Sequence, residues 1–207
     1  MARRSDHTRE QLTELILEAG EKIIATKGLR ELTVRQIGTA IGYSAGSVYN
    51  VFRNLDDLIS HINARTLRAL ETKIAEVQET GDVHADAKSV LQVYSRFQAE
   101  HSKLWAANNV HAMRQDIEQA QIYDEALDAV VDCVVRIVSP GLPNRSDKEV
   151  RKSVRVLWAS LLGIASVPAS ARFLKEGGYS VDLMAEDLVE HYLRGLIAEQ
   201  DDQEPHR

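Results

Sequence analysis

The stretch that decides the fold is TVRQIGTAIGYSAGSVYNVF, from Thr33 to Phe52. Its apolar residues recur three and four positions apart, as on one face of a helix, in two sets on either side of Gly42. These residues are Val34, Ile37 and Ile41, then Val48 and Phe52. The spacing predicts two short helices with a tight turn between them. The second helix opens on the small side chains of Ser44, Ala45, Gly46 and Ser47, so its N-terminal end carries little bulk.

Two short helices joined by a glycine-containing turn are the helix-turn-helix motif, whose second helix lies in the major groove of DNA. A helix of ~7 residues is ~10 Å long, which suits a groove ~12 Å wide. Small side chains at its start let free backbone N–H groups approach phosphates and base edges. We expect Ala40 to let the two helices cross closely. We also expect the apolar face to pack on Leu15, Ile16, Ala19 and Ile23 of a preceding helix. An ordinary helical hairpin is the alternative.

The rest of the chain has the punctuation of helices and no sustained strand alternation. Capping-box patterns begin at Thr8 and Ser146, and Thr33, Ser44 and Asn54 are further expected N-caps. We expect a helix from Thr8 to a stop at Gly28 and a long helix over 54–79. Five more are expected near 85–101, 103–113, 118–138, from Ser146 to about Pro168, and 181–199, with a turn at Gly177 and Gly178. The predicted fold is therefore all-α, with a three-helix head and a body of roughly six helices.

The predicted domains are a head at 1–53 and a body at 54–200, linked by the 54–79 helix and followed by a disordered tail at 201–207. The net charge of the 207 residues is −6. Residues 1–53 hold 8 Lys/Arg and 6 Asp/Glu, a net charge of +2, whereas the remainder holds 17 and 25, a net charge of −8. A slightly basic head on an acidic body fits a module that faces a polyanion, although chance gives such a split easily.

Other functional classes find little support. The single cysteine, Cys133, excludes an internal disulfide and fits a reducing compartment. No apolar run reaches the ~20 residues of a membrane span, and the N-terminus lacks the apolar core of a signal peptide. The seven histidines show no metal-ligand spacing, and phosphate-loop and nucleophile-elbow motifs are absent. We expect a soluble cytoplasmic protein with no cofactor, no metal and no enzymatic activity.

The stretch LTVRQIGTAIGYSAGSVYNVFRNLDDLI resembles the tetracycline-repressor (TetR) family of bacterial transcriptional regulators. That family typically reads T-x-x-x-I-A-x-x-x-G-V-S-x-G-x-x-Y-x-H/Y-F-x-x-K-x-x-L here. The matching positions are Thr33, Ile37, Gly42, Ser44, Gly46, Tyr49, Phe52 and Leu58. The resemblance implies a DNA-binding regulator of transcription.

The resemblance also implies which residues meet DNA. They are Thr33, Arg35, Ser44, Ala45, Gly46, Ser47, Tyr49, Asn50 and Arg53, with Tyr49 giving its hydroxyl to a phosphate. Two positions depart from the family: a basic residue is frequent where Ala45 stands, and a lysine usually stands at Leu55. Arg53 could replace that lysine; otherwise binding is less salt-sensitive. Arg3 and Arg4 form either a flexible DNA-contacting arm or a solvated tail.

In the body the resemblance is weaker. Tyr94, Phe97 and the later run LWASLLGI are similar to a ligand-binding domain with a Trp-x-x-x-His-Gly signature, of which Trp158 and Gly163 are present but Leu162 replaces the histidine. The candidate ligand-binding residues are the larger side chains expected between the fourth and eighth helices: Tyr94, Phe97, His101, Trp105, His111, Met113, Tyr123 and Trp158. Each of them alone is more often plain core than a ligand contact. They suit an uncharged or weakly acidic hydrophobic or aromatic effector.

The last two predicted helices are apolar on more than one face and therefore need a second covering surface. We expect them to pair across a two-fold axis as a four-helix bundle, through Val154, Leu161, Leu162, Ala165, Leu188, Tyr192 and Leu196. Gly163 would permit close helix approach. A monomer core is the alternative. The function predicted is a homodimeric repressor that a small effector releases from an inverted-repeat operator. Its rivals are a regulator whose ligand strengthens DNA binding and, with only the pocket in its favour, a helical enzyme.

Overall fold

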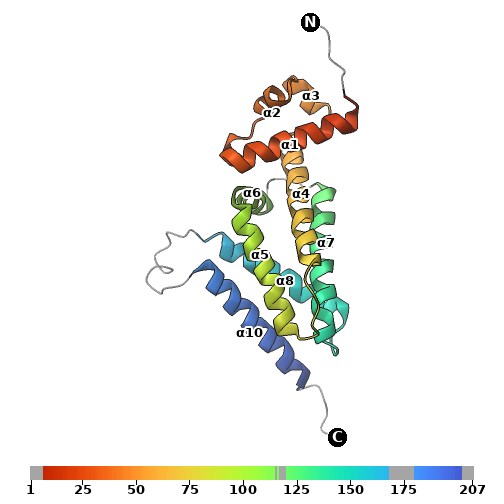
Figure 1. Cartoon of the computed structure of the whole chain (residues 1–207), viewed down its shortest axis with the longest axis vertical. Helices are drawn as coiled ribbons and strands as arrows, with labels where there is room; N and C mark the ends of the chain where they lie inside the picture. The colour runs from red at the N-terminus through yellow and green to blue at the C-terminus, as the bar shows by residue number, and fades with distance from the viewer. Residues whose placement is uncertain (1–6, 115, 117–119, 168–179, 202–207) are drawn as a thin grey trace. The chain divides into compact units, whose positions relative to one another are not determined.

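The structure is a computed structural model, and it describes residues 7–114, 116, 120–167 and 180–201. These residues contain nine α-helices and two short 3-10 turns, with no strand among them, which confirms the all-α prediction (Figure 1). They divide into two compact units. The first comprises residues 1–69 and 98–127, and the second comprises residues 70–97 and 128–207. The predicted Pro168 helix end, the Gly177–Gly178 turn, Arg3, Arg4 and all but the first residue of the 201–207 tail lie outside the described residues.

Three helices at the start of the first unit form the helix-turn-helix head. They are α1 (Arg9–Lys27), α2 (Val34–Ile41) and α3 (Ala45–Tyr49). Each begins at the expected cap, because the hydroxyl oxygens of Thr8, Thr33 and Ser44 each accept a hydrogen bond of 3.2 Å from a backbone N–H in the first turn. Such caps satisfy N–H groups that no carbonyl of the helix can reach. The recognition helix α3 has 5 residues, slightly fewer than expected, because it ends at Tyr49 with Asn50 as its C-cap.

The turn between α2 and α3 depends on two glycines. Gly42 ends α2 in the left-handed region, at φ 75° and ψ 24°, where a side chain would be strained. Gly38 is buried, and a Cβ on it would lie 2.8 Å from the Tyr43 carbonyl oxygen. The prediction that Ala40 lets the helices cross closely was wrong, because Ala40 is exposed. Gly38 holds the position of close approach instead, since it lies on the buried face beside Ile37.

The core of the first unit is buried almost completely. Ile16, Ile24 and Ile37 are 0 % exposed, and Val48 and Phe52 are 1 % and 3 % exposed. They share one cluster with Leu58 and Ile62 of α4 (Leu55–Ala75) and Ala107 of α6 (Ser102–Ala112). Leu15 is only half-buried and is not part of that cluster, whose further α1 member is Leu17; Ala19 and Ile23 are partly buried and pack against it, as predicted. Arg65 of α4 also pairs with Glu14 and Glu21 of α1 at 2.7 and 2.8 Å.

The second unit is built from parts of α4, α5 (Val83–Glu100) and α7 (Gln121–Val138), with α8 (Asp147–Ala165) and α10 (Val181–Asp201). The Ser146 capping box opens α8 as predicted. Helix α4 ends at Ala75, earlier than expected. The loop that follows is held by Asp86, a buried carboxylate that accepts hydrogen bonds from the Thr80 N–H, the Thr80 hydroxyl and the Gly81 N–H.

Helices α8 and α10 pack against each other, yet both keep exposed apolar side chains. Among the 19 residues of α8 only Val150 and Ser153 are buried. Val156 of α8 is 42 % exposed and Leu183 of α10 is 48 % exposed. A Cβ on Gly163 would meet no described atom within 4 Å, so the close approach expected there does not occur within the described part of the chain. None of the described helices is long and apolar enough to span a membrane.

Candidate functional site

The N-terminal end of α3 is open to solvent. Ser44, Gly46, Tyr49 and Asn50 are exposed, and Tyr49 is 55 % exposed although it is a large aromatic residue. A Cβ on Gly46 would meet only the Ser44 hydroxyl, at 3.6 Å. Val48, between these residues, is buried and anchors the helix. One side of α3 is therefore fixed in the core, while the other presents hydroxyl, amide and backbone groups that no described residue covers.

The remaining predicted contact residues surround this edge of the motif. Thr33 and Arg35 are exposed at the start of α2, whereas Ala45 is half-buried and packs on the head core. The Ser44 and Ser47 hydroxyl oxygens lie 3.1 Å apart, and Ser44 also caps α3. The structure thus gathers the predicted set on one motif, but part of it, Thr33, Ser44 and Ala45, also holds the motif together.

Arg53 is exposed, but it contacts the carboxylate of Asp57. Its guanidinium Nη2 lies 3.4 Å from Oδ1 of Asp57, and its backbone N–H donates to Oδ2 of the same carboxylate. Asp57 in turn lies in the first turn of α4, where Asn54 accepts its N–H at 2.8 Å. Leu55 is half-buried and packs on the head core. A phosphate contact by Arg53 therefore competes with Asp57.

A feature that the sequence analysis missed is the contact between Tyr43 and His7. The Tyr43 hydroxyl lies 2.6 Å from His7 Nδ1, and the rings are tilted with centroids 5.9 Å apart. Tyr43 lies in the turn of the motif, at a position where the family pattern has valine. The tyrosine in place of that valine is the feature of the sequence that could have indicated this contact. The pair places the start of the described chain beside the turn.

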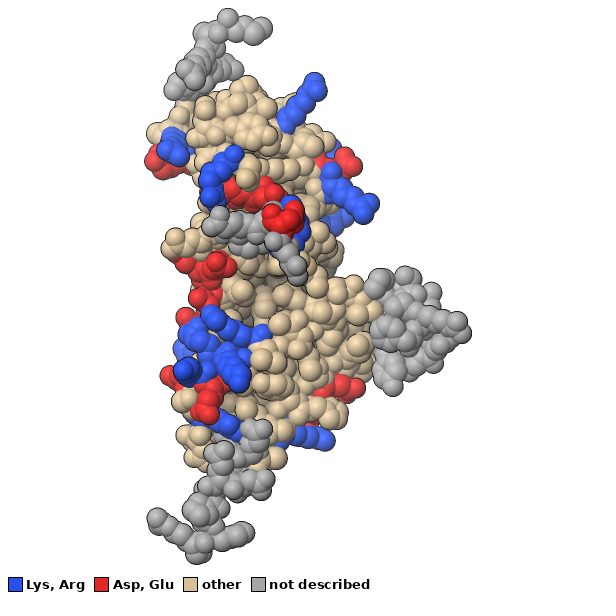
Figure 2. Space-filling model, turned by 180° about the vertical axis from the view of Figure 1, so that it is seen from behind, with Lys and Arg blue, Asp and Glu red and all other residues tan. Residues whose placement is uncertain are grey.

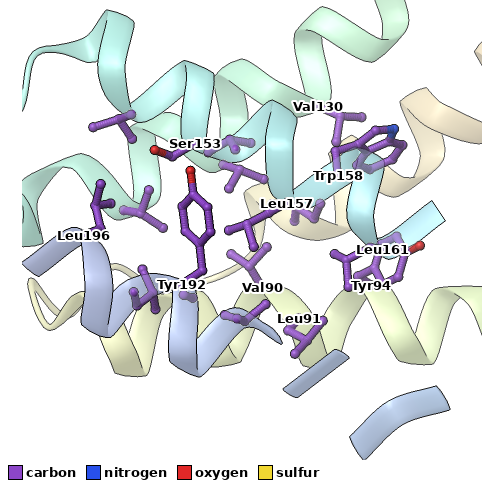
Figure 3. Close-up of a pocket in the computed structure, with 18 of the residues that line it drawn as sticks. Val90, Leu91, Tyr94, Val130, Ser153, Leu157, Trp158, Leu161, Tyr192 and Leu196 are labelled. Carbon is purple, nitrogen blue, oxygen red and sulfur yellow. The ribbon is translucent and has the colours of Figure 1, made fainter. Parts of the chain in front are cut away.

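The second unit contains an apolar cavity of about 90 Å³. Its lining comes from α4, α5, α7, α8 and α10 and is mostly aliphatic (Figure 3). At one end the Tyr94 and Trp158 rings meet edge to face at 6.0 Å, and at the other the Tyr192 hydroxyl points toward Ser153. Such a lining has many dispersion contacts and few hydrogen-bond partners to offer, so it suits an apolar group.

The structure brings together only part of the predicted ligand-binding set. Tyr94 and Trp158 line the cavity, but Phe97, His101, Trp105, His111, Met113 and Tyr123 are not among its described lining residues. His101 and Met113 are exposed. Four residues predicted at a dimer interface, Val154, Leu161, Tyr192 and Leu196, also line the cavity, whereas Leu162, Ala165 and Leu188 are half-buried and do not; the interface itself stays a prediction. Val90, Leu91 and Leu157 also line the cavity, but aliphatic side chains of this size give no signal in the sequence.

Three of the other candidates lie buried in the first unit. His111 Nε2 is 3.5 Å from Asp56 Oδ1, and Arg114 Nη1 is 2.6 Å from the same oxygen, so this pair joins the end of α6 to the first turn of α4. Burial raises the pKa of Tyr123 to about 12, with a further increase from Asp124 and an opposing effect of Asn108. Trp105 is 1 % exposed. These residues pack the first unit.

Family models match both parts of the chain. Residues 16–62 match the description "Bacterial regulatory proteins, tetR family", and residues 87–192 match "Tetracyclin repressor-like, C-terminal domain". The second match alone covers half of the chain. The protein belongs to the TetR family.

Named relatives agree with this assignment. The chain is 19 % identical over 182 residues to the "Fatty acid metabolism regulator protein" of Bacillus subtilis, covering 87 % of this chain and 93 % of the relative. A TetR transcriptional regulator from Rhodococcus sp. RHA1 has the same fold, with a TM-score of 0.68, 14 % identity and coverage of 91 % and 97 % of the two chains. Thermus thermophilus FadR, a TetR-family repressor solved with lauroyl-CoA, has a TM-score of 0.63, 18 % identity and coverage of 89 % and 93 %. This TetR-family protein is accordingly a DNA-binding transcription regulator.

Proposed function

We propose that this protein is a homodimeric repressor that binds an inverted-repeat operator and leaves it when a small hydrophobic or aromatic effector occupies the cavity of the second unit. The observation that supports this most directly is the uncovered edge of α3 beside a buried anchor, Val48. On the functional level the head at 1–53 reads DNA and the body at 54–200 senses the effector.

In the proposed complex Tyr49 donates its hydroxyl to a phosphate, and Asn50 and Ser47 reach base edges or phosphate. Phosphate contacts position the head, and base contacts specify the sequence. The exposed side chains of Thr33 and Arg35 suit the flanking backbone. Because Leu55 replaces a lysine and Arg53 is paired with Asp57, few cations contact phosphate, and the salt dependence should be shallow.

A two-fold partner is proposed for two reasons. One recognition helix of 5 residues reads too few base pairs, whereas two heads ~34–36 Å apart read an inverted repeat. Helices α8 and α10 also leave Val156 and Leu183 exposed. Figure 2 shows, in the lower half of the view, a patch of basic and acidic side chains beside a broad area without charged side chains. An isologous four-helix bundle would cover such a face.

The effector is proposed from the lining of the cavity. Its walls are mostly aliphatic, with Tyr94 and Trp158 at one end and Tyr192 at the other, as Figure 3 shows. The T. thermophilus relative was solved with lauroyl-CoA, which carries an acyl chain. The cavity of about 90 Å³ is smaller than the roughly 150 Å³ that admits benzene in an engineered cavity. An effector with an acyl chain must therefore move the half-buried side chains of α8 and α10 apart.

That widening offers a route to regulation. Ile74, near the end of α4, lines the cavity, and the same helix begins at Leu55, directly after the head. An effector that prefers the widened cavity shifts the protein toward an arrangement in which α4 holds the heads out of register with the operator. The size of the effect equals the difference in affinity for the two arrangements.

The test is a gel-shift titration of the full-length protein on DNA from its own promoter, at several salt concentrations. We expect a retarded complex that an effector dissociates, and a loss of at least tenfold in affinity for Asn50→Ala. Lys22→Ala, which changes an exposed side chain of α1, is the matched control and should bind normally. A folded dimer that shifts no promoter DNA at any salt concentration would contradict the proposal.

The second candidate is a regulator whose ligand strengthens DNA binding. The small size of the cavity favours release, because a ligand that must widen the body changes its geometry. The sign of the ligand effect in the same gel-shift titration separates the two functions.

A further inference from the structure

The apolar cavity of the second unit shares lining residues with two polar grooves of opposite charge. The first groove, here called the acidic groove, shares Leu91, Val189 and Leu193 with the cavity. Its ionisable residues are His84, Lys88, Glu186, Asp187 and Glu190, a formal charge of −2 with His84 neutral. All of these residues belong to the same unit.

The second groove, here called the basic groove, shares Ser153, Tyr192 and Leu196 with the cavity and has a volume of about 480 Å³. Its ionisable residues are Arg145, Glu149, Lys152 and His191, a formal charge of +1 with His191 neutral. Ser153 and Tyr192, whose hydroxyls lie at one end of the cavity in Figure 3, line both the cavity and the basic groove. The acidic groove meets the cavity only through aliphatic side chains among the described lining residues.

Within the basic groove the one carboxylate among the described residues, that of Glu149, already accepts hydrogen bonds. Glu149 Oε2 accepts hydrogen bonds from the Ser146 N–H and hydroxyl at 2.9 and 2.7 Å, and these bonds lower the pKa of Glu149. Arg145 donates to the Leu196 carbonyl at 3.0 Å and lies 3.7 Å from Glu149 Oε1. Lys152 is exposed and has no ion pair with any residue that the structure describes. Its ammonium is therefore available to an anion.

From this arrangement we infer that the effector is an anionic amphiphile, whose acyl chain enters the apolar cavity and whose anionic head group lies in the basic groove. The inference rests on the proposed effector role of the cavity and adds the class and direction of the ligand. Ser153 and Tyr192 donate hydroxyl hydrogen bonds to the head group, and Lys152 supplies the opposite charge. The acidic groove repels the same head group, which excludes the reversed orientation.

A free carboxylate and the phosphates of an acyl thioester share this chemistry, so the experiment includes both. Dissociation constants of laurate, lauroyl-CoA and 1-dodecanol are measured by calorimetry on the full-length protein, below the aggregation concentration of each ligand. Lys152→Glu reverses the charge in the basic groove, and Lys88→Glu makes the same change in the acidic groove. Lys152→Gln, together with thermal melting of every variant, controls for misfolding.

We expect the neutral alcohol to bind at least tenfold more weakly than the better of the two anions. Lys152→Glu should weaken the anions at least tenfold, with Lys152→Gln in between, and change the alcohol less than twofold. Lys88→Glu should weaken neither class. If laurate binds better than lauroyl-CoA, the head group is a carboxylate; the reverse order assigns it to phosphates.

The inference is overturned if 1-dodecanol binds as tightly as the anions, or if Lys152→Glu and Lys88→Glu weaken the anions equally. The first result leaves a hydrophobic effector in place and removes only the head-group site. Failure of all three ligands to bind wild-type protein also overturns the inference. The promoter gel shift then decides separately whether the protein is a regulator with a different effector.

Discussion

The helix-turn-helix head and the helix pair α8–α10 use apolar residues in different ways. In the head, Ile16, Ile24 and Ile37 are completely buried within the chain. In α8, apolar side chains line a cavity on one face, while Val156 on another face is 42 % exposed. The head has a complete core and exposes small and polar groups at α3. The helix pair α8–α10 has apolar residues on two faces that the described residues do not cover completely.

This difference separates two kinds of function. A surface that reads DNA must keep its shape, so its supporting core is closed. A region that responds to a ligand and a partner needs side chains with somewhere to move, because only alternative arrangements of similar free energy can be shifted by binding. Substitutions matched between the two regions test this contrast.

The largest effect is expected for truncation in the head core. Ile37→Ala should lower the free energy of unfolding by about 3 kcal/mol, because Ile37 is 0 % exposed and leaves a cavity in a closed cluster. Leu157→Ala, at a half-buried residue that already borders a cavity, should cost about 1 kcal/mol. Urea unfolding followed by circular dichroism measures both. Equal losses would show that the two regions are packed alike.

The next effect concerns the partner surface. Val156→Glu should weaken dimerisation by at least a hundredfold, because it places a carboxylate on the face of α8 that the proposed partner covers. Val110→Glu makes the same change at a residue of α6 that is 58 % exposed, and it should leave the dimer intact. Analytical ultracentrifugation over a concentration series distinguishes the two. A dimer unaffected by Val156→Glu would place the interface elsewhere.

A smaller effect is expected from two glycines. Gly42→Ala should destabilise the head by about 1 kcal/mol, since Gly42 has a φ of 75°. Gly163→Ala should stabilise the chain by up to about 1 kcal/mol in helix propensity, because a Cβ there meets no described atom within 4 Å. Thermal melting of dilute protein shows whether each substitution raises or lowers the stability. Destabilisation by Gly163→Ala would reveal a close contact at this position.

The smallest effect is a pH dependence in the second unit. Burial tends to raise the pKa of Asp86, but the hydrogen bonds from Thr80 and Gly81 outweigh it and hold the pKa below its usual value. The carboxylate therefore stabilises the fold above the unfolded-state pKa of about 3.9, and this contribution is lost as the pH falls through the lower native value. Urea midpoints between pH 6 and 2 should fall less steeply for Asp86→Asn than for wild type. Parallel curves would exclude this role.

Much of the fold could be read from local patterns. The caps at Thr8, Thr33, Ser44, Asn54 and Ser146 were predicted because a side-chain oxygen satisfies N–H groups only a few residues away. The end of α4 was misplaced, because the carboxylate of Asp86 holds the loop after it from the following helix. Ala40 was mistaken for the crossing residue for a similar reason. Gly38 and Ala40 are both small residues of α2, and only the tertiary structure shows which of them faces the backbone of the following turn.

The candidate sites divide in the same way. The residues expected to meet DNA lie close together in sequence, and the structure places them on one motif. The cavity draws its lining from five helices, and aliphatic residues such as Val90 and Leu157 give no sign in the sequence that they surround a space. Tyr192 and Leu196 line this cavity, and their place at a dimer interface stays a prediction. The sequence alone does not distinguish an apolar face that covers a cavity from one that covers a partner.

By itself, then, the sequence determined the helices, their caps and the motif that reads DNA, since all of these depend on contacts within one or two helical turns. Only the tertiary structure decided which apolar faces close on each other and which enclose a cavity. It also showed that Ser153 and Tyr192 line both that cavity and a groove of positive formal charge, to which Lys152 belongs. The reason is that packing and local charge depend on several segments at once. The residue spacing within one segment does not determine the distances between segments.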